Sequence, residues 1–318
     1  MNVREPLALM RRDELLSDGT GWRALAASVS SGDLVAVRPG VFAFGADWRR
    51  QRSEQEAVTR AHAYALMARH EPVFSGPSAA ALHGLPLFRV PADDVHVLAG
   101  DMRAGAARGV VRHDGPIIDD DVVEVGGLRC TSLARTLADL ARSASEETTV
   151  AAADAALHRY VDRNEYDEDA AASLIDAARG HLGGFARRVD VAHRALEFAD
   201  GRAQLPGESV SRVYFHRLGF PIPRLQVPVP GPKGTPYAVD FGFEGMRLFG
   251  EFDGEAKYTD PEFLQGRTAQ QAIMDEKKRE DWIRATTGWQ LVRWMMPNLQ
   301  SPSVFGSLLR GMGVRPPA

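Results

Sequence analysis

Acidic side chains gather in one short stretch of the chain, between Pro236 and Tyr258. Asp240 lies in a first apolar run, and Glu251 and Asp253 lie at the end of a second. Like charges this close together repel one another, and a divalent cation with oxygen ligands is the usual compensation. The residue types therefore predict a divalent-cation site built from these three carboxylates.

Two short strands are predicted to position these acids. The runs 237–243 and 246–253 are rich in aromatic and apolar residues and are separated by two residues, which indicates a β-hairpin. Side chains alternate along a strand, so Glu251 and Asp253 share one face of the second run. The alternative is a purely structural one, in which both acids cap the strand end before the turn at Gly254.

The remainder of the last hundred residues predicts an α/β core with a mixed sheet around this hairpin. A helix that carries Glu208 is predicted to follow Pro206, with Gly219 as its C-cap. The other expected elements are a strand in PRLQVPVP, a charged helix at 272–284, a strand at 289–294 that carries Arg293, and a last helix at 305–312.

Spaced motifs in this region resemble the restriction-endonuclease-like superfamily, in particular a domain of unknown function related to very-short-patch-repair endonucleases. The motifs are Glu208 in the first helix, VDF at 239–241, GEFDG at 250–254, EKKRED at 276–281 and GWQLVRW at 288–294. The resemblance implies that an aspartate and a glutamate hold Mg²⁺ for cleavage of DNA, while a lysine two positions after the glutamate orients the attacking water. Asp253 occupies that lysine position here, which departs from the pattern.

Two placements restore a lysine to the site. Lys257 has the acidic-x-lysine spacing relative to Glu255, but it follows Gly254, where the strand should have ended. Alternatively, the three carboxylates act as a set, and Lys257 or Lys277 reaches in from an adjacent element. We favour the second placement because strand alternation aims two of the carboxylates together.

The expected chemistry is metal-assisted hydrolysis of a phosphodiester, in which the metal binds the scissile phosphate and lowers the pKa of a coordinated water. Without a lysine near the metal, the domain would bind DNA without cutting it. The candidate catalytic residues are Asp240, Glu251, Asp253, Lys257 and Glu208, with Arg293 in support.

Residues 1–50 predict a small DNA-binding module. Helical patterns at 5–10, 11–17 and 21–30 precede a strand–turn–strand pattern, which is the order of a winged helix. The stretch SGDLVAVRPGVFAF resembles the wing of the AbiEi-type antitoxin N-terminal domain. The alternative is a unit that merely packs on the next domain. The side chains predicted to contact DNA are Arg11, Arg12, Arg23 and Arg38 here, and Lys277 and Arg293 near the C-terminus.

Residues 51–160 predict a mixed α+β middle domain, followed by a helical connector at 161–205 and the last domain at 206–318. The segments SAAALHGLP, TSLARTLADLAR and AADAAL resemble the AbiEi-like family, which implies an antitoxin or repressor with a toxin partner. Strands are expected in DDVHVLAG, GVVRHDG and VVEVGGLRCTS, and RAGAARG is expected to be a flexible turn. The histidines His83, His96 and His113 match no compact metal motif and are interpreted as structural.

The composition limits the partners. The chain has 318 residues and a net charge of -4, so DNA contact must come from local basic patches. The single cysteine, Cys130, excludes an internal disulfide, and no apolar run approaches the roughly 18 residues of a spanning helix, which favours a cytoplasmic protein with no membrane role.

Two functions follow. The first is a DNA-binding protein of multidomain α/β fold with a metal-dependent nuclease-like C-terminal domain. The second is an AbiEi-like antitoxin or transcriptional repressor whose nuclease fold is inactive. A structural interaction protein is a third possibility.

Overall fold

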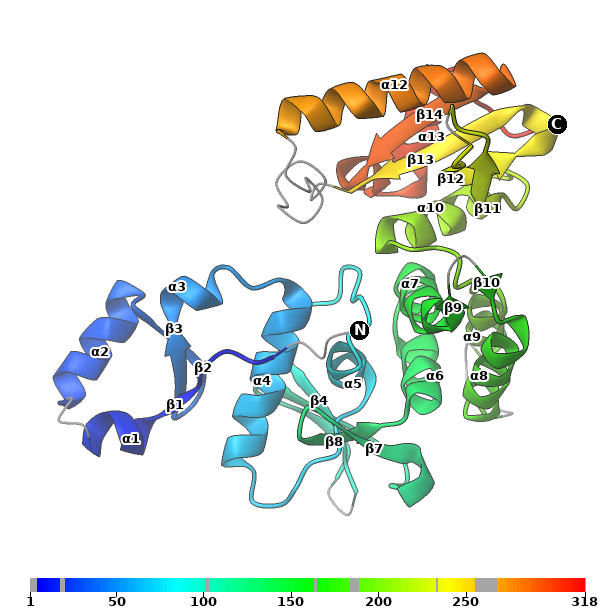
Figure 1. Ribbon diagram of the computed structural model, residues 1–318. Coiled ribbons are helices and arrows are strands. Elements are labelled where there is room, and N and C mark those ends of the chain that lie inside the picture. The colour runs from blue at the N-terminus through cyan, green and yellow to red at the C-terminus, as the bar shows by residue number, and fades with distance from the viewer. Residues whose placement is uncertain are drawn as a thin grey trace. The chain divides into compact units, whose positions relative to one another are not determined.

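The computed structural model describes residues 5–17, 21–100, 103–162, 165–183, 189–232, 234–254 and 268–317. The fold is mixed α/β and divides into two compact units (Figure 1). The first, called unit 1, comprises Met1–Ala152 and Asp169–Phe198. The second, called unit 2, comprises Ala153–Glu168 and Ala199–Ala318. The chain therefore enters unit 2, returns to unit 1 and enters unit 2 again.

Unit 1 begins with a three-stranded antiparallel sheet in the order β1-β3-β2 and two helices that precede its hairpin. The predicted helix at 5–10 is wrong, because residues 5–9 are not helical and Met10 belongs to β1. Leu7 and Leu9, spaced two apart, pack against the hairpin core, and this spacing suits an extended chain. The elements are β1 Met10–Arg11, α1 Arg12–Ser17, α2 Trp22–Ser31, β2 Leu34–Arg38 and β3 Val41–Phe44.

Helices α4, α5, α6 and α7 and two small sheets follow. The predicted turn at 103–109 instead contains an edge strand, β5, paired with β6, and the predicted single strand at 122–132 is a hairpin that turns at Gly126 and Gly127, both with positive φ. Ser132 caps α6 by accepting a hydrogen bond from the Arg135 N–H. The elements are α3 Gly45–Trp48, α4 Ser53–Met67, α5 Gly76–Leu82, β4 Val95–Leu98, β5 Gly105–Ala107, β6 Val110–His113, β7 Val122–Val125, β8 Leu128–Thr131, α6 Leu133–Ser143, α7 Glu146–Leu157, α8 Glu168–Gly180 and α9 Val189–Glu197.

Two histidines of neighbouring strands form a stacked pair in unit 1. His96 Nδ1 lies 2.8 Å from His113 Nε2, because β4 and β6 pair in parallel next to each other. Burial, and then the charge of His113, lowers the pKa of His96 to about 4. The pair is therefore neutral at physiological pH and contributes to packing.

Unit 2 is built on a four-stranded mixed sheet in the order β11-β12-β13-β14. The first three strands are antiparallel, and β14 pairs in parallel with β13. The predicted helix, hairpin, charged helix and final strand are all confirmed. The elements are β9 Val161–Asp162, β10 Glu165–Tyr166, α10 Pro206–Arg217, β11 Arg224–Val229, β12 Tyr237–Phe243, β13 Leu248–Asp253, α12 Ala269–Thr287, β14 Gln290–Met295 and α13 Pro302–Gly311.

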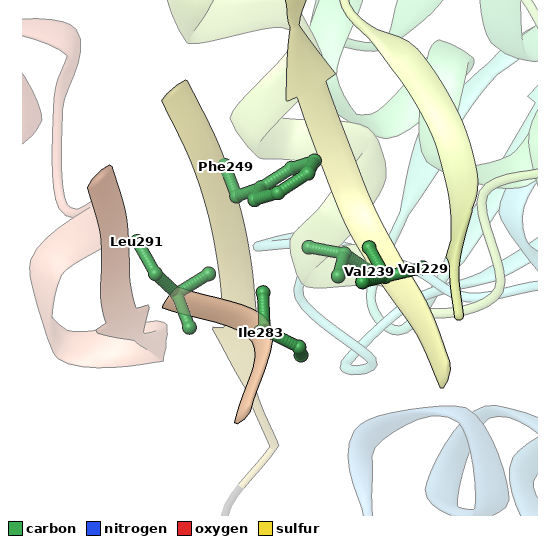
Figure 2. Packing of buried hydrophobic residues seen from close by; sticks show 5 residues of the cluster. All are labelled: Val229, Val239, Phe249, Ile283 and Leu291. Atoms are coloured by element: carbon green, nitrogen blue, oxygen red, sulfur yellow. The ribbon is translucent and has the colours of Figure 1, made fainter. Parts of the chain in front are cut away.

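Helices cover both faces of this sheet (Figure 1). On one face, Ile283 of α12 packs on strand residues in a core shown in Figure 2, whose members are Val229, Val239, Phe249, Ile283 and Leu291. On the other face, Phe215 of α10 and Phe305 of α13 make edge contacts with Trp294 at ring-centroid distances of 5.5 and 5.1 Å. Such aromatic pairs add stabilisation to that of area burial, so the sheet is held rigidly between two layers.

No helix within the described residues is long and apolar enough to cross a membrane.

Candidate functional site

The two strands of the predicted hairpin separate next to Asp240. Strands β12 and β13 pair from Phe243 with Leu248 to Phe241 with Gly250. Beyond that pair, the backbone N–H of Phe252 donates to Asp240 Oδ2 at 2.8 Å. A side-chain carboxylate thus takes the place of a backbone carbonyl, and the sheet opens into a fork at this point.

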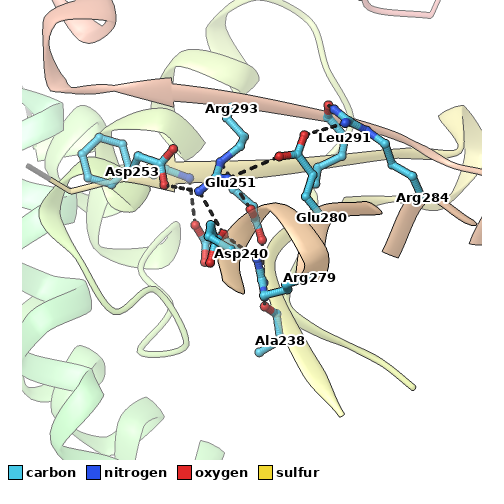
Figure 3. A network of polar contacts seen from close by, with 11 residues as sticks. Ala238, Asp240, Glu251, Asp253, Arg279, Glu280, Arg284, Leu291 and Arg293 are labelled. Atoms are coloured by element: carbon cyan, nitrogen blue, oxygen red, sulfur yellow. Dashed lines mark hydrogen bonds and ion pairs between the residues drawn. The ribbon is translucent and has the colours of Figure 1, made fainter. Parts of the chain in front are cut away.

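The second strand of the fork presents Glu251 and Asp253 to helix α12. Glu251 lies beside Arg293 in the parallel register of β13 and β14. Its Oε1 accepts a hydrogen bond from Arg279 Nη2 at 2.6 Å, and its Oε2 lies 3.6 Å from Arg293 Nε. Asp253 Oδ1 accepts from Arg293 Nη2 at 2.6 Å. The predicted shared face of these two acids is confirmed, and it is the face that α12 covers (Figure 3).

Helix α12 contributes further charges to the same network. Glu276 Oε1 lies 3.0 Å from Nη1 of Arg279 and 3.0 Å from Nη2 of Arg293. Glu280 lies 3.6 Å from Arg293 and pairs with Arg284 at 2.5 Å. The spacing of 276, 279 and 280 brings these side chains to one helix face. With Asp240, the described residues of this network comprise five carboxylates and three guanidiniums, an excess of two negative charges.

Two guanidiniums of this network, those of Arg279 and Arg293, have raised pKa values. Burial lowers the pKa of Arg293, but its hydrogen bond to Asp253 and the neighbouring carboxylates outweigh burial and raise it. The same balance, dominated on the raising side by Glu251, raises the pKa of Arg279. Sequence reasoning missed Arg279, although its place three residues after Glu276 on a charged helix is a signal that it faces the same way.

The donor atoms suit a hard cation. Carboxylate oxygens are the ligands that Mg²⁺ prefers. Glu251 is 4% exposed, and among the described residues its buried Oε2 has no hydrogen-bond partner. In the present arrangement arginines stand beside the carboxylates, and the described residues contain no group of three or more His, Cys, Asp or Glu side chains placed to hold a metal. The residue types fit Mg²⁺, and its binding would require Glu251 and Asp253 to turn from their arginines.

Glu208 lies next to the fork through Gln226. Its Oε2 accepts hydrogen bonds from the Gln204 N–H at 3.0 Å and from Gln226 Nε2 at 3.3 Å. Gln226 lies between Leu225 and Val227, which pair with Phe241 and Val239 on either side of Asp240, and its φ of 50° lies in the left-handed region. A non-glycine residue held there stores strain, which often accompanies a functional site. Sequence reasoning missed Gln226, because nothing in PRLQVPVP signals a left-handed residue.

Of the two candidate lysines, only Lys277 is among the described residues, and it does not join the network. Lys257 lies outside the described residues. Lys277 is exposed, one position after Glu276 and so about 100° around the helix from it.

The N-terminal arginines divide into two groups. Arg23 is exposed on α2, and Arg12 lies over the Trp22 ring at 5.2 Å. Arg11 is 3.4 Å from Asp13. Arg38 turns toward its own unit, where it lies 4.5 Å over the Tyr64 ring. Of the four, Arg12 begins α1 and Arg23 lies on α2.

Two bacterial proteins are similar to this chain along most of its length. They are the uncharacterized protein Rv2248 of Mycobacterium tuberculosis strain H37Rv and the uncharacterized protein MT2308 of strain CDC 1551 / Oshkosh. Each is 30% identical over 241 residues, which span 76% of this chain and 81% of the relative. The chain belongs to their family. The aligned 241 residues include parts of both compact units, since neither unit alone has 241 residues. No family model matches the chain.

Proposed function

We propose that unit 2 is a metal-dependent DNA endonuclease of the restriction-endonuclease-like type, built on residues 206–318. The observation that carries the proposal is the fork, where Asp240 accepts the Phe252 N–H and adjacent strand residues supply Glu251 and Asp253. Three hard-oxygen side chains from two strands at the opening of a sheet are the composition of a Mg²⁺ site for phosphodiester hydrolysis.

The residues of this site would have three roles: holding the metal, binding the phosphate and positioning Asp240. Asp240, Glu251 and Asp253 would hold Mg²⁺, which when bound supplies Lewis-acid stabilisation and an activated water. Arg279 and Arg293, released from their carboxylates, would bind the oxygens of the scissile phosphate, for which a planar guanidinium is well suited. Glu208 would fix Gln226, and through it the strand opposite Asp240, so that the carboxylate keeps its position.

Plasmid nicking tests this proposal. The protein is incubated with supercoiled DNA in Mg²⁺, in Mn²⁺ and in chelator, and Asp240→Asn is compared with the wild type. An asparagine oxygen still accepts the Phe252 N–H, so the fold is retained while a metal ligand is lost. We expect nicking only with metal, and a loss of at least a hundredfold in the variant.

The matched control is Glu244→Gln, because Glu244 is an exposed acid at the other end of the hairpin. It should nick like the wild type. Equal activity of Asp240→Asn and the wild type would refute the assignment of this site.

A second candidate function is favoured by the arginines beside the carboxylates. Guanidiniums already neutralise Glu251 and Asp253, as expected of a nuclease fold that has lost its metal. In this case the protein would act as an AbiEi-like antitoxin or repressor, with a winged helix at residues 1–50 that presents Arg23 to DNA and with a toxin as partner.

This alternative predicts selective, salt-dependent binding to the DNA upstream of the protein's own gene. Arg23→Ala should weaken binding and flatten its salt dependence, whereas Arg50→Ala, an exposed arginine outside α2, should not. Binding to that DNA in chelator together with no nicking in either metal would favour this function over the first.

A further inference from the structure

Unit 1 contains a cavity of about 670 Å³ that neither proposed function uses. It is lined by strand β2, helix α4, strand β4 and the turn between β5 and β6. Its charged side chains are Arg38, Arg60, Arg108 and Asp93, and Val37 and Val95 form an apolar part of its wall. The size is typical of small-ligand sites.

The charge in this cavity is unbalanced. Three arginines face it and the lining includes one acid, Asp93, whose side chain is 83% exposed and lies 3.9 Å from Arg60. An ion pair with so exposed a carboxylate and so long a separation has little interaction energy. A protein with a net charge of -4 thus gathers positive charge at one concave place, where low-dielectric walls strengthen the local field.

Two of these arginines donate hydrogen bonds to main-chain carbonyls, which carry no net charge. Arg38 Nη1 donates to the Gly109 carbonyl at 3.4 Å, and Arg60 Nη1 donates to the Val37 carbonyl at 3.3 Å. Both bonds are long and end on neutral acceptors. Arg38 and Arg60 are therefore oriented by these contacts but not neutralised by them.

Two buried nitrogen atoms support the same conclusion. Nε of Arg60 and Nε of Arg112, on the adjacent strand β6, are buried and have no hydrogen-bond partner among the residues that the structure describes. Burial lowers the pKa of Arg38, and the charge of Arg112 lowers it further. Two of the four guanidiniums in this neighbourhood thus keep a buried donor unmet among the described residues, and an anion with several oxygen atoms would satisfy such donors.

We propose that this cavity binds a phosphate ester, with Arg38, Arg60 and Arg108 on the phosphate oxygens and Val37 and Val95 against the body of the ligand. Several guanidiniums favour phosphate, because its tetrahedral oxygens accept from more than one fork at once. The phosphate could belong to a small phosphorylated molecule or to the DNA backbone, and the two sources share this chemistry. The proposal does not depend on nuclease activity in unit 2.

Titration calorimetry of the full chain tests the cavity, with inorganic pyrophosphate and adenosine diphosphate as probes. Chelator is present throughout, so that unit 2 cannot hold a probe through a metal. We expect saturable binding of one probe molecule per chain. Arg108→Gln should weaken it about tenfold, which is the loss of one charge-assisted contact. Arg108 is exposed in a turn, so this variant should fold normally.

A second lining variant, a variant outside the cavity and a DNA competitor complete the test. Arg60→Gln should also weaken binding, whereas Arg50→Gln, an arginine that does not line the cavity, should bind like the wild type. If a short DNA duplex displaces the probe from the wild type, the phosphate is that of DNA; if it does not, the ligand is a small molecule. Absence of probe binding, or equal binding by wild type and Arg108→Gln and Arg60→Gln, would overturn the proposal.

Discussion

Replacement of Glu251 by glutamine should destabilise unit 2 measurably. The Glu251 side chain is 5% exposed, and its Oε1 lies 2.6 Å from Arg279 Nη2. Loss of one partner of a buried ion pair costs about 3–5 kcal/mol, because the other charge stays buried without compensation. Here Glu276 remains 3.0 Å from Arg279, whose side chain is 19% exposed. The expected loss of unfolding free energy is therefore reduced to about 2 kcal/mol.

Urea unfolding in chelator, followed by tryptophan fluorescence, measures this loss. Three of the five tryptophans, Trp282, Trp289 and Trp294, lie in unit 2, so the signal reports mainly on that unit. A double variant, Glu251→Gln with Arg279→Gln, should lose less than the sum of the two single variants, because the two side chains interact directly.

The control is Glu244→Gln. Its carboxylate is 63% exposed and pairs with an equally exposed Arg224, so its loss should cost less than about 1 kcal/mol. If Glu251→Gln and Glu244→Gln proved equally stable, or if the double variant were strictly additive, Glu251 would not be the buried counter-ion of Arg279, and the reasoning would fail.

Three further predictions concern stability. The pKa of His96 in the folded chain, about 4, is below its ordinary 6.5, so the unfolded chain binds the proton at a higher pH than the folded chain does. The unfolding free energy of unit 1 should therefore fall by about 2 kcal/mol as the pH falls from 6.5 to 4. Thermal unfolding across this pH range measures the fall, which should be absent in His96→Gln. Arg212→Leu should cost about 3–5 kcal/mol in urea unfolding, because it leaves Asp154, 0% exposed, without its 2.6 Å partner; a cost below 1 kcal/mol would contradict this. Gly207→Ala should cost about 1–3 kcal/mol, since its Cβ would lie 2.1 Å from the Phe252 ring, and an unchanged melting temperature would contradict this.

The sequence predicted the part of the site that local rules determine. Strand alternation placed Glu251 and Asp253 on one face, and the position of Arg293 beside Leu291 followed from the same rule. The structure has both features. It also adds Arg279, which helical spacing puts on the same face as Glu276. That spacing does not say that this face meets the strands, because the packing of Ile283 against the sheet sets the rotation of α12 about its axis.

Sequence patterns failed to predict the secondary structure of segments whose conformation depends on tertiary contacts. Residues 5–10 have a helical pattern, yet Leu7 and Leu9 gain more by packing on the hairpin in an extended conformation. The glycine-rich segment at 103–109 has low strand propensity, but β6 offers it a free edge to pair with. The fork could not be foreseen either, since it depends on the side chain of Asp240 replacing a main-chain acceptor.

The alternation of the chain between the two units has a consequence for its synthesis. Residues 153–168 belong to unit 2, but the rest of that unit begins at 199. At about 5–20 residues added per second, the first segment waits for several seconds beside the ribosome before its partners emerge, while unit 1 also stays incomplete until 169–198 are made. No single cut in the gene separates the two units: a truncation after residue 152 removes residues 169–198 from unit 1, and a start at residue 199 removes residues 153–168 from unit 2.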